Sequence, residues 1–223
     1  MYGKSIRVNL YLIKKLQRKL LVWFEKNGRK FPWREPHRSP YEIFVAEMML
    51  QKTRAEGIVD VYLRFIKQYQ NIKELAKADL TGLTELLKPL GLYRRRARDM
   101  LNLSKIVVEK YQGKLPASKK ELLMLPGIGI YIASAFLSVA YNRPLPIVDT
   151  NIRRLYSRFF SLNIHKDLRR DKFVWELAAK ILPRKNCKEF NWALLDLSAM
   201  VCKSKVPLCA SCPVREDCAC QSV

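Results

Sequence analysis

Acidic residues are scarce in this chain, which has 20 Asp and Glu against 42 Lys and Arg and a formal net charge of +22 over 223 residues. A positive excess of this size goes far beyond what solubility requires, and a polyanionic partner explains it most simply. We therefore expect a nucleic acid, rather than an anionic membrane surface, as the partner. The hydrophobic fraction of 49% is enough for a substantial core in one or two domains.

Long unbroken apolar stretches are also lacking. No charged residue lies between Glu121 and Arg143, a length that could cross a bilayer. Pro126 and two glycines break this stretch, however, and leave only a short apolar segment at 131–141. A buried helix accounts for that segment better than a membrane span. Because no signal peptide is evident and the cysteines fit free thiols, we expect a protein of the reducing cytoplasm.

The chain has no pair of alternating segments joined by a hairpin turn, so the signal for a β-sheet is weak. Apolar residues instead recur at intervals of three and four, as from Ile13 to Trp23, after which Asn27 and Gly28 offer a stop. An apolar segment covers 41–50, and further helical patterns cover roughly 57–70, 80–88, 93–110, 118–124, 131–141, 150–160, 172–182 and 188–201. We predict an all-α protein.

A tight turn separates two of the expected helices. Ser118 followed by Glu121 fits a capping box, which starts a short helix that ends at the sequence Leu-Pro-Gly-Ile-Gly of residues 125–129. Glycines in such a turn let backbone N–H groups face outward just before the next helix begins, and these amides suit a phosphate group. An ordinary interhelical turn could have the same sequence. The candidate phosphate contacts are Gly127, Ile128 and Gly129.

Only one Cys-x-x-Cys pair occurs in a group of four cysteines that lie within 17 residues: Cys202, Cys209, Cys212 and Cys218. Thiols this close in sequence can enclose a metal centre but do not easily form two unstrained disulfides. Structural zinc favours paired short knuckles, whereas iron–sulfur clusters use four thiolates at irregular spacings. The spacing of the four cysteines therefore does not distinguish a zinc site from an iron–sulfur cluster. Cys187 and Cys220 are expected to be ordinary buried or solvated thiols.

Downstream of the turn, Asp149 stands where a helix would start, and an N-cap role would explain it. The order of turn, aspartate and four-cysteine motif nevertheless resembles the helix-hairpin-helix DNA glycosylases of the endonuclease III superfamily over nearly the whole chain. The resemblance implies a [4Fe–4S] cluster on the four cysteines. It also implies a helical barrel at 40–142, a second helical lobe of 1–39 and 143–223 that carries the cluster, and an active site in the cleft between the lobes.

The resemblance also implies three catalytic residues. Bifunctional members of the superfamily carry a lysine after the hairpin that forms a Schiff base; this chain has Tyr131, so base removal without an efficient lyase step is expected. Asp149 would stabilise the oxocarbenium-like sugar or orient the attacking water. Glu47, kept protonated by desolvation, would assist the departing base. Without the resemblance, Glu47 could be a surface glutamate and Tyr131 a packing residue.

An enzyme that acts on a base must extrude it from the duplex and fill the gap. By the same resemblance, Gln51 or Lys52 intercalates. Further DNA contacts are implied at two places. Tyr93 and Arg94 lie where a turn leads into an arginine-rich stretch, whose plainer interpretation is a solvated basic face. Lys203 and Lys205 lie between the first two cluster cysteines.

Two activities fit this branch of the superfamily: removal of thymine or uracil opposite guanine, and removal of adenine opposite guanine or 8-oxoguanine. Segment 40–53, P-Y-E-I-F-V-A-E-M-M-L-Q-K-T, resembles both groups, and its M-L-Q leans toward the MutY adenine glycosylases. Segment 190–199 resembles the thymine enzymes more, and MutY proteins usually continue past the cluster, whereas this chain ends five residues after Cys218. We expect a monomeric thymine mismatch glycosylase acting on double-stranded DNA. A non-catalytic DNA-binding module is the third interpretation, and it gives Asp149 and Glu47 no role.

Overall fold

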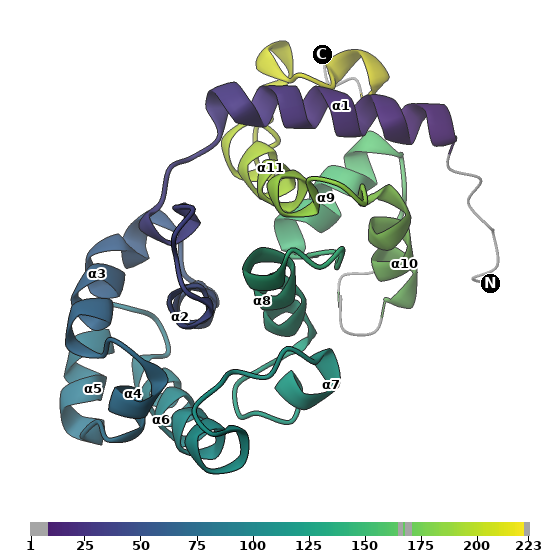
Figure 1. Cartoon of the computed structure of the whole chain (residues 1–223). Helices are drawn as coiled ribbons and strands as arrows, with labels where there is room; N and C mark the ends of the chain where they lie inside the picture. Colours follow the sequence, from purple (N-terminus) through teal and green to yellow (C-terminus); the bar gives the residue numbers. More distant parts are fainter. Residues whose placement is uncertain (1–8, 165–166, 168–170, 221–223) are drawn as a thin grey trace. The chain divides into compact units, whose positions relative to one another are not determined.

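The computed structural model describes residues 9–164, 167 and 171–220, and all of its regular secondary structure there is helical (Figure 1). These described ranges contain no β-strand, so the all-α prediction is confirmed. No helix within them is both long and apolar enough to cross a membrane.

The chain forms two compact units. The terminal unit, residues 1–29 and 144–223, contains α1 (Leu10–Asn27), α9 (Thr150–Phe159), α10 (Lys172–Ile181), α11 (Cys187–Met200) and the 3₁₀ helices η3 (Cys209–Ser211) and η4 (Arg215–Asp217). The central unit, residues 30–143, contains η1 (Pro32–Arg34), α2 (Pro40–Met49), η2 (Glu56–Ile58), α3 (Val59–Gln68), α4 (Ile72–Ala76), α5 (Leu80–Leu87), α6 (Tyr93–Tyr111), α7 (Lys119–Leu122) and α8 (Ile130–Tyr141).

The segment 30–39 belongs to the central unit and not, as expected, to the lobe formed by the two ends of the chain. Its aromatic side chains explain the difference. Trp33 is 5% exposed, stacks on Phe31 with 4.8 Å between ring centroids, and packs edge-on against Tyr62 of α3 at 5.3 Å. Contacts of this kind bury large apolar areas, so the segment is held by α3. The second crossing lies between residues 143 and 144, one residue after the expected position.

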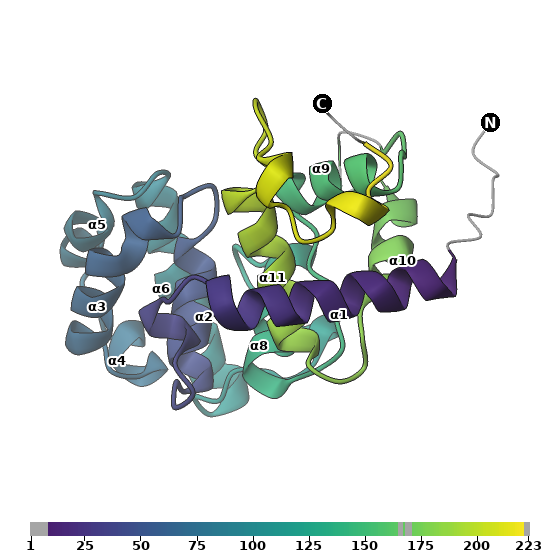
Figure 2. The same ribbon diagram turned by 90° about the horizontal axis from the view of Figure 1, so that it is seen from above.

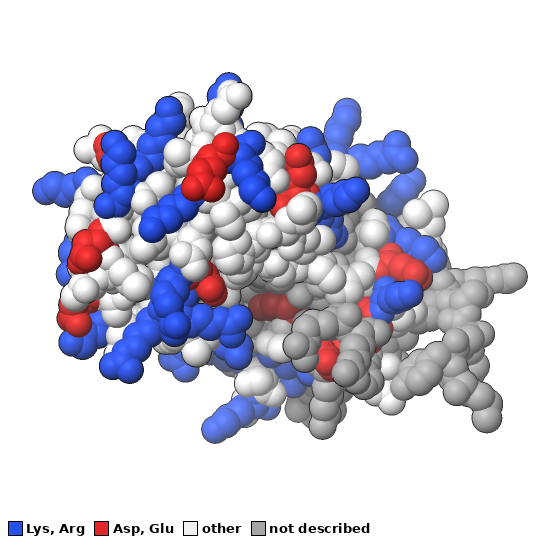
Figure 3. All heavy atoms as spheres, turned by 90° about the horizontal axis from the view of Figure 1, so that it is seen from below, with Lys and Arg blue, Asp and Glu red and all other residues white. Residues whose placement is uncertain are grey.

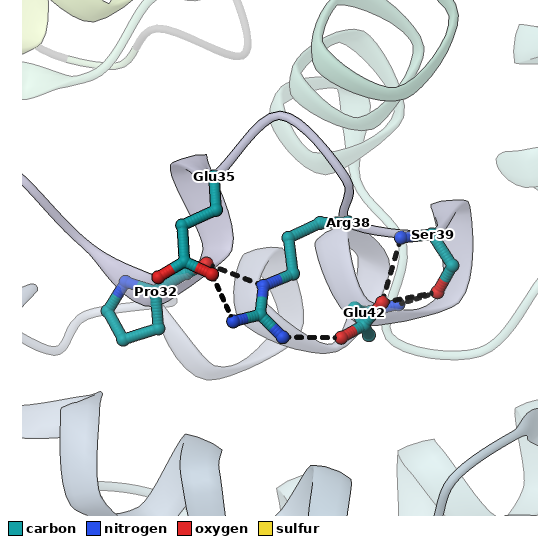
Figure 4. A network of polar contacts seen from close by, with 5 residues as sticks. All are labelled: Pro32, Glu35, Arg38, Ser39 and Glu42. Atoms are coloured by element: carbon teal, nitrogen blue, oxygen red, sulfur yellow. Dashed lines mark hydrogen bonds and ion pairs between the residues drawn. The ribbon is translucent and has the colours of Figure 1, made fainter.

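Helix α2 is the buried helix of the central unit, since eight of its ten residues are buried, and it packs against α8. Its start is fixed by Pro40 at the first turn and by a complete capping box (Figure 4). Glu42 accepts a 2.8 Å hydrogen bond from the backbone N–H of Ser39, and Ser39 Oγ accepts one of 3.3 Å from the N–H of Glu42. Arg38 donates to the same carboxylate at 2.7 Å. The N-terminal turn of α2 therefore begins in one defined orientation.

The capping box expected at Ser118 and Glu121 does not form. Ser118 is the N-cap residue of α7, but in the described structure its side chain makes no capping hydrogen bond, and α7 ends at Leu122. The sequence also missed the short helix α4, where Asn71 caps the backbone N–H groups of Lys73 and Glu74.

The terminal unit is organised around α11, which packs against both α1 and α9; α1 crosses α11 in Figure 1 and Figure 2. Apolar residues expected on one face of α1, such as Leu16 and Leu20, are buried. Asp196 of α11 is fully buried and accepts 2.8 Å hydrogen bonds from the backbone N–H and Nε of Arg29. Asn191 donates to the carbonyl of Leu145 at 3.0 Å. Helix α11 thus binds the chain at Arg29, just before the central unit begins, and at Leu145, just after it ends.

Candidate active site

Glu47 lies in the middle of α2 and is 7% exposed. Burial raises the pKa of its carboxyl group to about 7, and the positive charge of Arg34 opposes this shift only in part. Within the described residues, Glu47 Oε2 is buried without a hydrogen-bond partner. An unsatisfied buried oxygen costs about 1–3 kcal/mol, and such atoms concentrate at functional sites. Glu47 is therefore not a surface glutamate, and near neutral pH its carboxyl group is protonated in a large fraction of the molecules.

The turn between α7 and α8 has the backbone shape that its glycines suggest. Gly127 has a φ of +78°, and a Cβ atom there would lie 3.0 Å from the Cβ of Asp99. Gly129 is the N-cap residue of α8, and among the described residues beyond its chain neighbours no atom lies within 4 Å of the position that its Cβ would take. Because the first N–H groups of a helix have no intrahelical acceptor, this open end can receive an anion. Ile128 is only 8% exposed, and its backbone N–H donates to the carbonyl of Leu125 at 3.3 Å.

Tyr131 lies in the first turn of α8 and is partly exposed. Since α2 packs against α8, the helices that carry Glu47 and Tyr131 are neighbours in the central unit.

The end of α2 meets this hairpin. Gln51 donates from Nε2 to the carbonyl of Gly127 at 3.4 Å and to Met48 Sδ at 3.6 Å. Lys52, the next residue, is exposed and has a φ of +53°. Two groups of expected DNA contacts, the turn at 51–53 and the hairpin at 127–129, are therefore side by side in the central unit.

The arginine-rich stretch at 94–98 is not a single basic face. Arg94 is exposed, with its guanidinium 5.5 Å from the ring centroid of the half-buried Tyr93. Arg96 is instead 4% exposed and donates hydrogen bonds to backbone carbonyls. The tertiary structure thus separates residues that the sequence grouped together.

Asp149 is the N-cap residue of α9 in the terminal unit. Its Oδ1 accepts hydrogen bonds from the N–H groups of Asn151 and Ile152 at 2.9 and 2.7 Å, and its Oδ2 accepts one from Asn151 Nδ2 at 3.0 Å. These three bonds hold the carboxyl group of this half-buried residue in one orientation.

A chain of hydrogen bonds continues from Asp149 to the cysteine loop. Asn151 Oδ1 accepts from Arg154 Nη1 at 2.9 Å, and Arg154 donates to the carbonyl of Cys202 at 3.0 and 2.9 Å. One turn further on, Arg158 donates to the carbonyls of Lys203 and Ser204 at 2.7 and 3.0 Å. These three α9 side chains were not predicted as functional from the sequence, although their spacing of three and four residues places them on one face of the helix.

The four cysteines of the C-terminal motif line one pocket. Apolar side chains complete its wall, including Leu155, Phe159, Val201 and Val214. Burial raises the pKa of both Cys212 and Cys218. Four thiols around an apolar pocket are the donor set that an iron–sulfur cluster requires, so the residues fit the cluster implied by the resemblance. Among the residues that the structure describes, no three His, Cys, Asp or Glu side chains form a ready site for a single metal ion.

The two remaining cysteines differ. Cys187 is a buried thiol, which is one of the two alternatives expected for it. Cys220 instead lines the same pocket as the four motif cysteines. The backbone N–H of Cys220 donates to the carbonyl of Arg158 at 3.1 Å, which anchors the end of the loop to α9.

Lys203 and Lys205 are exposed on the loop between the first two motif cysteines. On the face drawn in Figure 3, Lys and Arg side chains are more widespread than acidic ones. Both observations agree with the polyanionic partner inferred from the net charge.

Comparison with known proteins places the chain. Residues 45–180 match the model of the family described as "HhH-GPD superfamily base excision DNA repair protein". The thymine-DNA glycosylase of Aeropyrum pernix is 38% identical over 92% of this chain and 94% of its own length. An adenine DNA glycosylase of Buchnera aphidicola is 36% identical over 89% of this chain and 56% of its own length. The solved structure of a thermostable thymine-DNA glycosylase aligns with a TM-score of 0.88 and 29% identity, covering 95% of this chain and 97% of the other.

Proposed function

The chain belongs to the HhH-GPD superfamily of base excision DNA repair proteins, and from this premise we propose that it is a monofunctional DNA glycosylase that removes thymine or uracil opposite guanine in double-stranded DNA. One observation carries the chemistry. The carboxyl group of Glu47, buried in α2, has a pKa of about 7, so it can hold a proton at neutral pH. A group with this pKa is suited to general acid catalysis.

In the proposed reaction, the bond between the sugar C1′ and the base nitrogen breaks, and its electron pair leaves with the base. Glu47 donates a proton or a hydrogen bond to the departing base, which lowers the cost of that negative charge. Water then adds to C1′ and releases one proton, which replaces the one given by Glu47 or neutralises the departed base, so the products are the free base and an abasic site. The missing hydrogen-bond partner of Oε2 within the described residues supports this role, because a base could supply one.

Asp149 would act on the sugar of the same nucleotide. Positive charge develops on the ring as the bond breaks, and a carboxylate held in place stabilises it without reorganising. The hydrogen bonds from Asn151 and Ile152 supply that fixed orientation. The N-cap and catalytic roles of Asp149 are compatible, since both backbone bonds go to Oδ1, while Oδ2 accepts from the side chain of Asn151.

Tyr131 carries the monofunctional part of the proposal. A lyase step requires an amine that forms an imine with C1′, and the residue after the hairpin here is a tyrosine. The proposed enzyme therefore leaves the abasic strand intact.

DNA would be gripped by the hairpin amides at 127–129, by Tyr93 and Arg94, and by Lys203 and Lys205. Gln51 or Lys52 would fill the gap that the extruded nucleotide leaves. The exposed Lys52 and the net charge of +22 support this arrangement. We propose that the active form is a monomer. Two expectations from the sequence remain predictions: that the active site lies in a cleft between the lobes, and that the protein is cytoplasmic.

We also propose that a [4Fe–4S] cluster is held by Cys202, Cys209, Cys212 and Cys218, whose thiols line one pocket. When bound, the cluster would supply a structural clip. The loop between its first two ligands, anchored by Arg158, would then present the two lysines to the phosphate backbone.

Adenine removal is the second candidate activity, favoured by the 36% identity to an adenine DNA glycosylase and by the sequence M-L-Q before Lys52. Thymine is preferred because of the 38% identity to a thymine-DNA glycosylase and the structural likeness to another, with a TM-score of 0.88.

A panel of duplexes tests the proposal. The protein is incubated in excess with duplexes that contain T·G, U·G, A·G, A·8-oxoguanine or only paired bases, and abasic sites are then cleaved with hot alkali. Product from T·G and U·G alone supports the proposal, and product from the adenine duplexes assigns the second activity. Cleavage without alkali would contradict the monofunctional assignment. No product from any duplex would favour the non-catalytic binding module.

A further inference from the structure

Arg96 is a buried arginine on α6 whose partners are all uncharged. It is 4% exposed, and within the described structure no carboxylate pairs with it. Removing a guanidinium from water is costly, and proteins normally offset that cost with an acidic partner. Here the offset comes from hydrogen bonds to the backbone, so the position of that backbone depends on the arginine.

The carbonyls that Arg96 binds lie in two separate places, at the end of α2 with the turn after it and in the turn before α6. At the end of α2, Nη1 donates to the carbonyl of Met48, and Nη2 donates to that of Gln51 at 3.0 Å. In the turn before α6, Nη2 donates to the carbonyl of Gly91 at 2.9 Å. The last carbonyls of a helix lack intrahelical donors and carry partial negative charge, which explains why a cation is stable at the end of α2. One guanidinium therefore cross-links the turn at 51–53 and the turn at 90–93.

The 51–53 turn requires such support. Lys52 has a φ of +53°, a conformation that non-glycine residues rarely adopt and that persists only when the surroundings impose it. The hydroxyl of Thr53 donates to the carbonyl of Gln51 at 3.2 Å and lies 3.4 Å from Arg96 Nη2. Both residues that flank Lys52 are thus tied to Arg96.

A third loop is attached to the same helix. Asp99, on α6 three residues after Arg96, lies so close to Gly127 that a Cβ atom there would be 3.0 Å from the Cβ of Asp99. Gln51 donates to the carbonyl of Gly127 at 3.4 Å. The hairpin at 127–129 is therefore in contact both with α6 and with the turn that Arg96 holds.

We propose that Arg96 is a positioning residue, which fixes the turns at 51–53 and 90–93 against the hairpin so that the three loops meet DNA as one preformed surface. The proposal rests on the proposed function, because these loops hold the expected intercalating and phosphate-binding residues. Arg96 itself contacts no phosphate. Its planar fork of donors matches carbonyls from two directions, whereas the ammonium group of lysine is a compact point charge that cannot span them.

The test compares Arg96→Lys and Arg96→Met with Arg64→Lys, a change at an exposed arginine on α3 of the same unit. Hydrogen exchange of peptides covering 48–54 and 90–94 is measured on the DNA-free protein. Base extrusion is followed by the fluorescence of 2-aminopurine next to a T·G mismatch, and the salt dependence of binding is measured on the same duplex.

For Arg96→Lys we expect faster exchange in both peptides, a smaller fluorescence increase, and single-turnover excision reduced roughly 100-fold, as misplacement of a positioning group by about 1 Å can cause. The slope of log K against log salt should stay at the wild-type value, because no phosphate contact is lost. Arg64→Lys should change none of these quantities.

Wild-type exchange and extrusion in Arg96→Lys would overturn the proposal, and so would a salt slope reduced by one phosphate contact. If Arg96→Met fails to fold, Arg96→Lys decides, because it keeps the charge. Failure of the wild-type protein to excise any base would refute the proposed function instead, since hydrogen exchange and extrusion do not depend on bond cleavage.

Discussion

Replacing Glu47 with glutamine should make the protein more stable at alkaline pH while it disables the chemistry. The carboxyl group has a pKa of about 7 in the folded protein, against an ordinary value of 4.5. Because the folded state binds the proton more tightly than the unfolded state, the free energy of unfolding falls as pH rises from about 4.5 to about 7 and is level beyond that range. A shift of about 2.5 pH units corresponds to about 3 kcal/mol.

The Glu47→Gln variant keeps a similar shape and is neutral at every pH. We therefore expect the variant to equal the wild type in stability near pH 4.5 and to exceed it by up to about 3 kcal/mol at pH 8, less the cost of burying the amide. Denaturant unfolding at pH 4.5, 6, 7 and 8 measures the difference between the two proteins. Single-turnover excision should fall about 100-fold or more, since the amide cannot give up a proton.

Glu109→Gln is the matched control, because Glu109 is an exposed glutamate on α6 of the same unit. Its difference from the wild type should not vary across this pH range. A difference between Glu47→Gln and the wild type that is equally flat would refute the desolvated carboxyl group and, with it, the general acid.

Four further predictions concern the other parts of the proposed site. Asp149→Asn should fold and bind mismatched DNA, since asparagine caps helices as well as aspartate does, but excision should fall about 100- to 1,000-fold in single-turnover assays. The purified protein should be brown, with absorption near ~400 nm, and Cys212→Ser should lose iron in a metal assay. Changing Lys203 and Lys205 together to alanine should reduce the slope of log K against log salt by about 1.8, at about 0.9 per phosphate. Gly127→Ala should weaken DNA binding and lower the free energy of unfolding by about 1–3 kcal/mol, because its φ is +78° and Asp99 occupies the space.

Each of these has a control or a contrary outcome in the same chain. Unchanged excision by Asp149→Asn would remove that residue from the mechanism, and a colourless, zinc-loaded protein with full activity would overturn the cluster. Lys110→Ala, at an exposed position on α6, should leave the salt slope unchanged. Gly57→Ala should be nearly neutral, because in the described part of the chain no atom beyond the adjacent residues lies within 4 Å of its Cβ position.

The sequence by itself determined the features that depend on neighbours along the chain. Apolar residues at intervals of three and four define the helices, and Asp149 caps α9 because an N-cap side chain accepts from backbone N–H groups only two and three residues later. The glycine turn before α8 is equally local, since the backbone conformation of Gly127 selects that residue type. Even local patterns were ambiguous in places, because Ser39 with Glu42 forms a capping box and Ser118 with Glu121 does not.

Only the tertiary structure decided which polar side chains lose their water. Arg96 is buried beside exposed arginines because its acceptors include carbonyls at the end of α2 and in the turn after it, up to 48 residues away. The raised pKa of Glu47 likewise arises from burial of α2, which packs against α8, and not from its own segment. The link from Arg154 to the Cys202 carbonyl also spans 48 residues. Desolvation and long-range hydrogen bonds are properties of the packed chain, so no pattern of neighbouring residues specifies them.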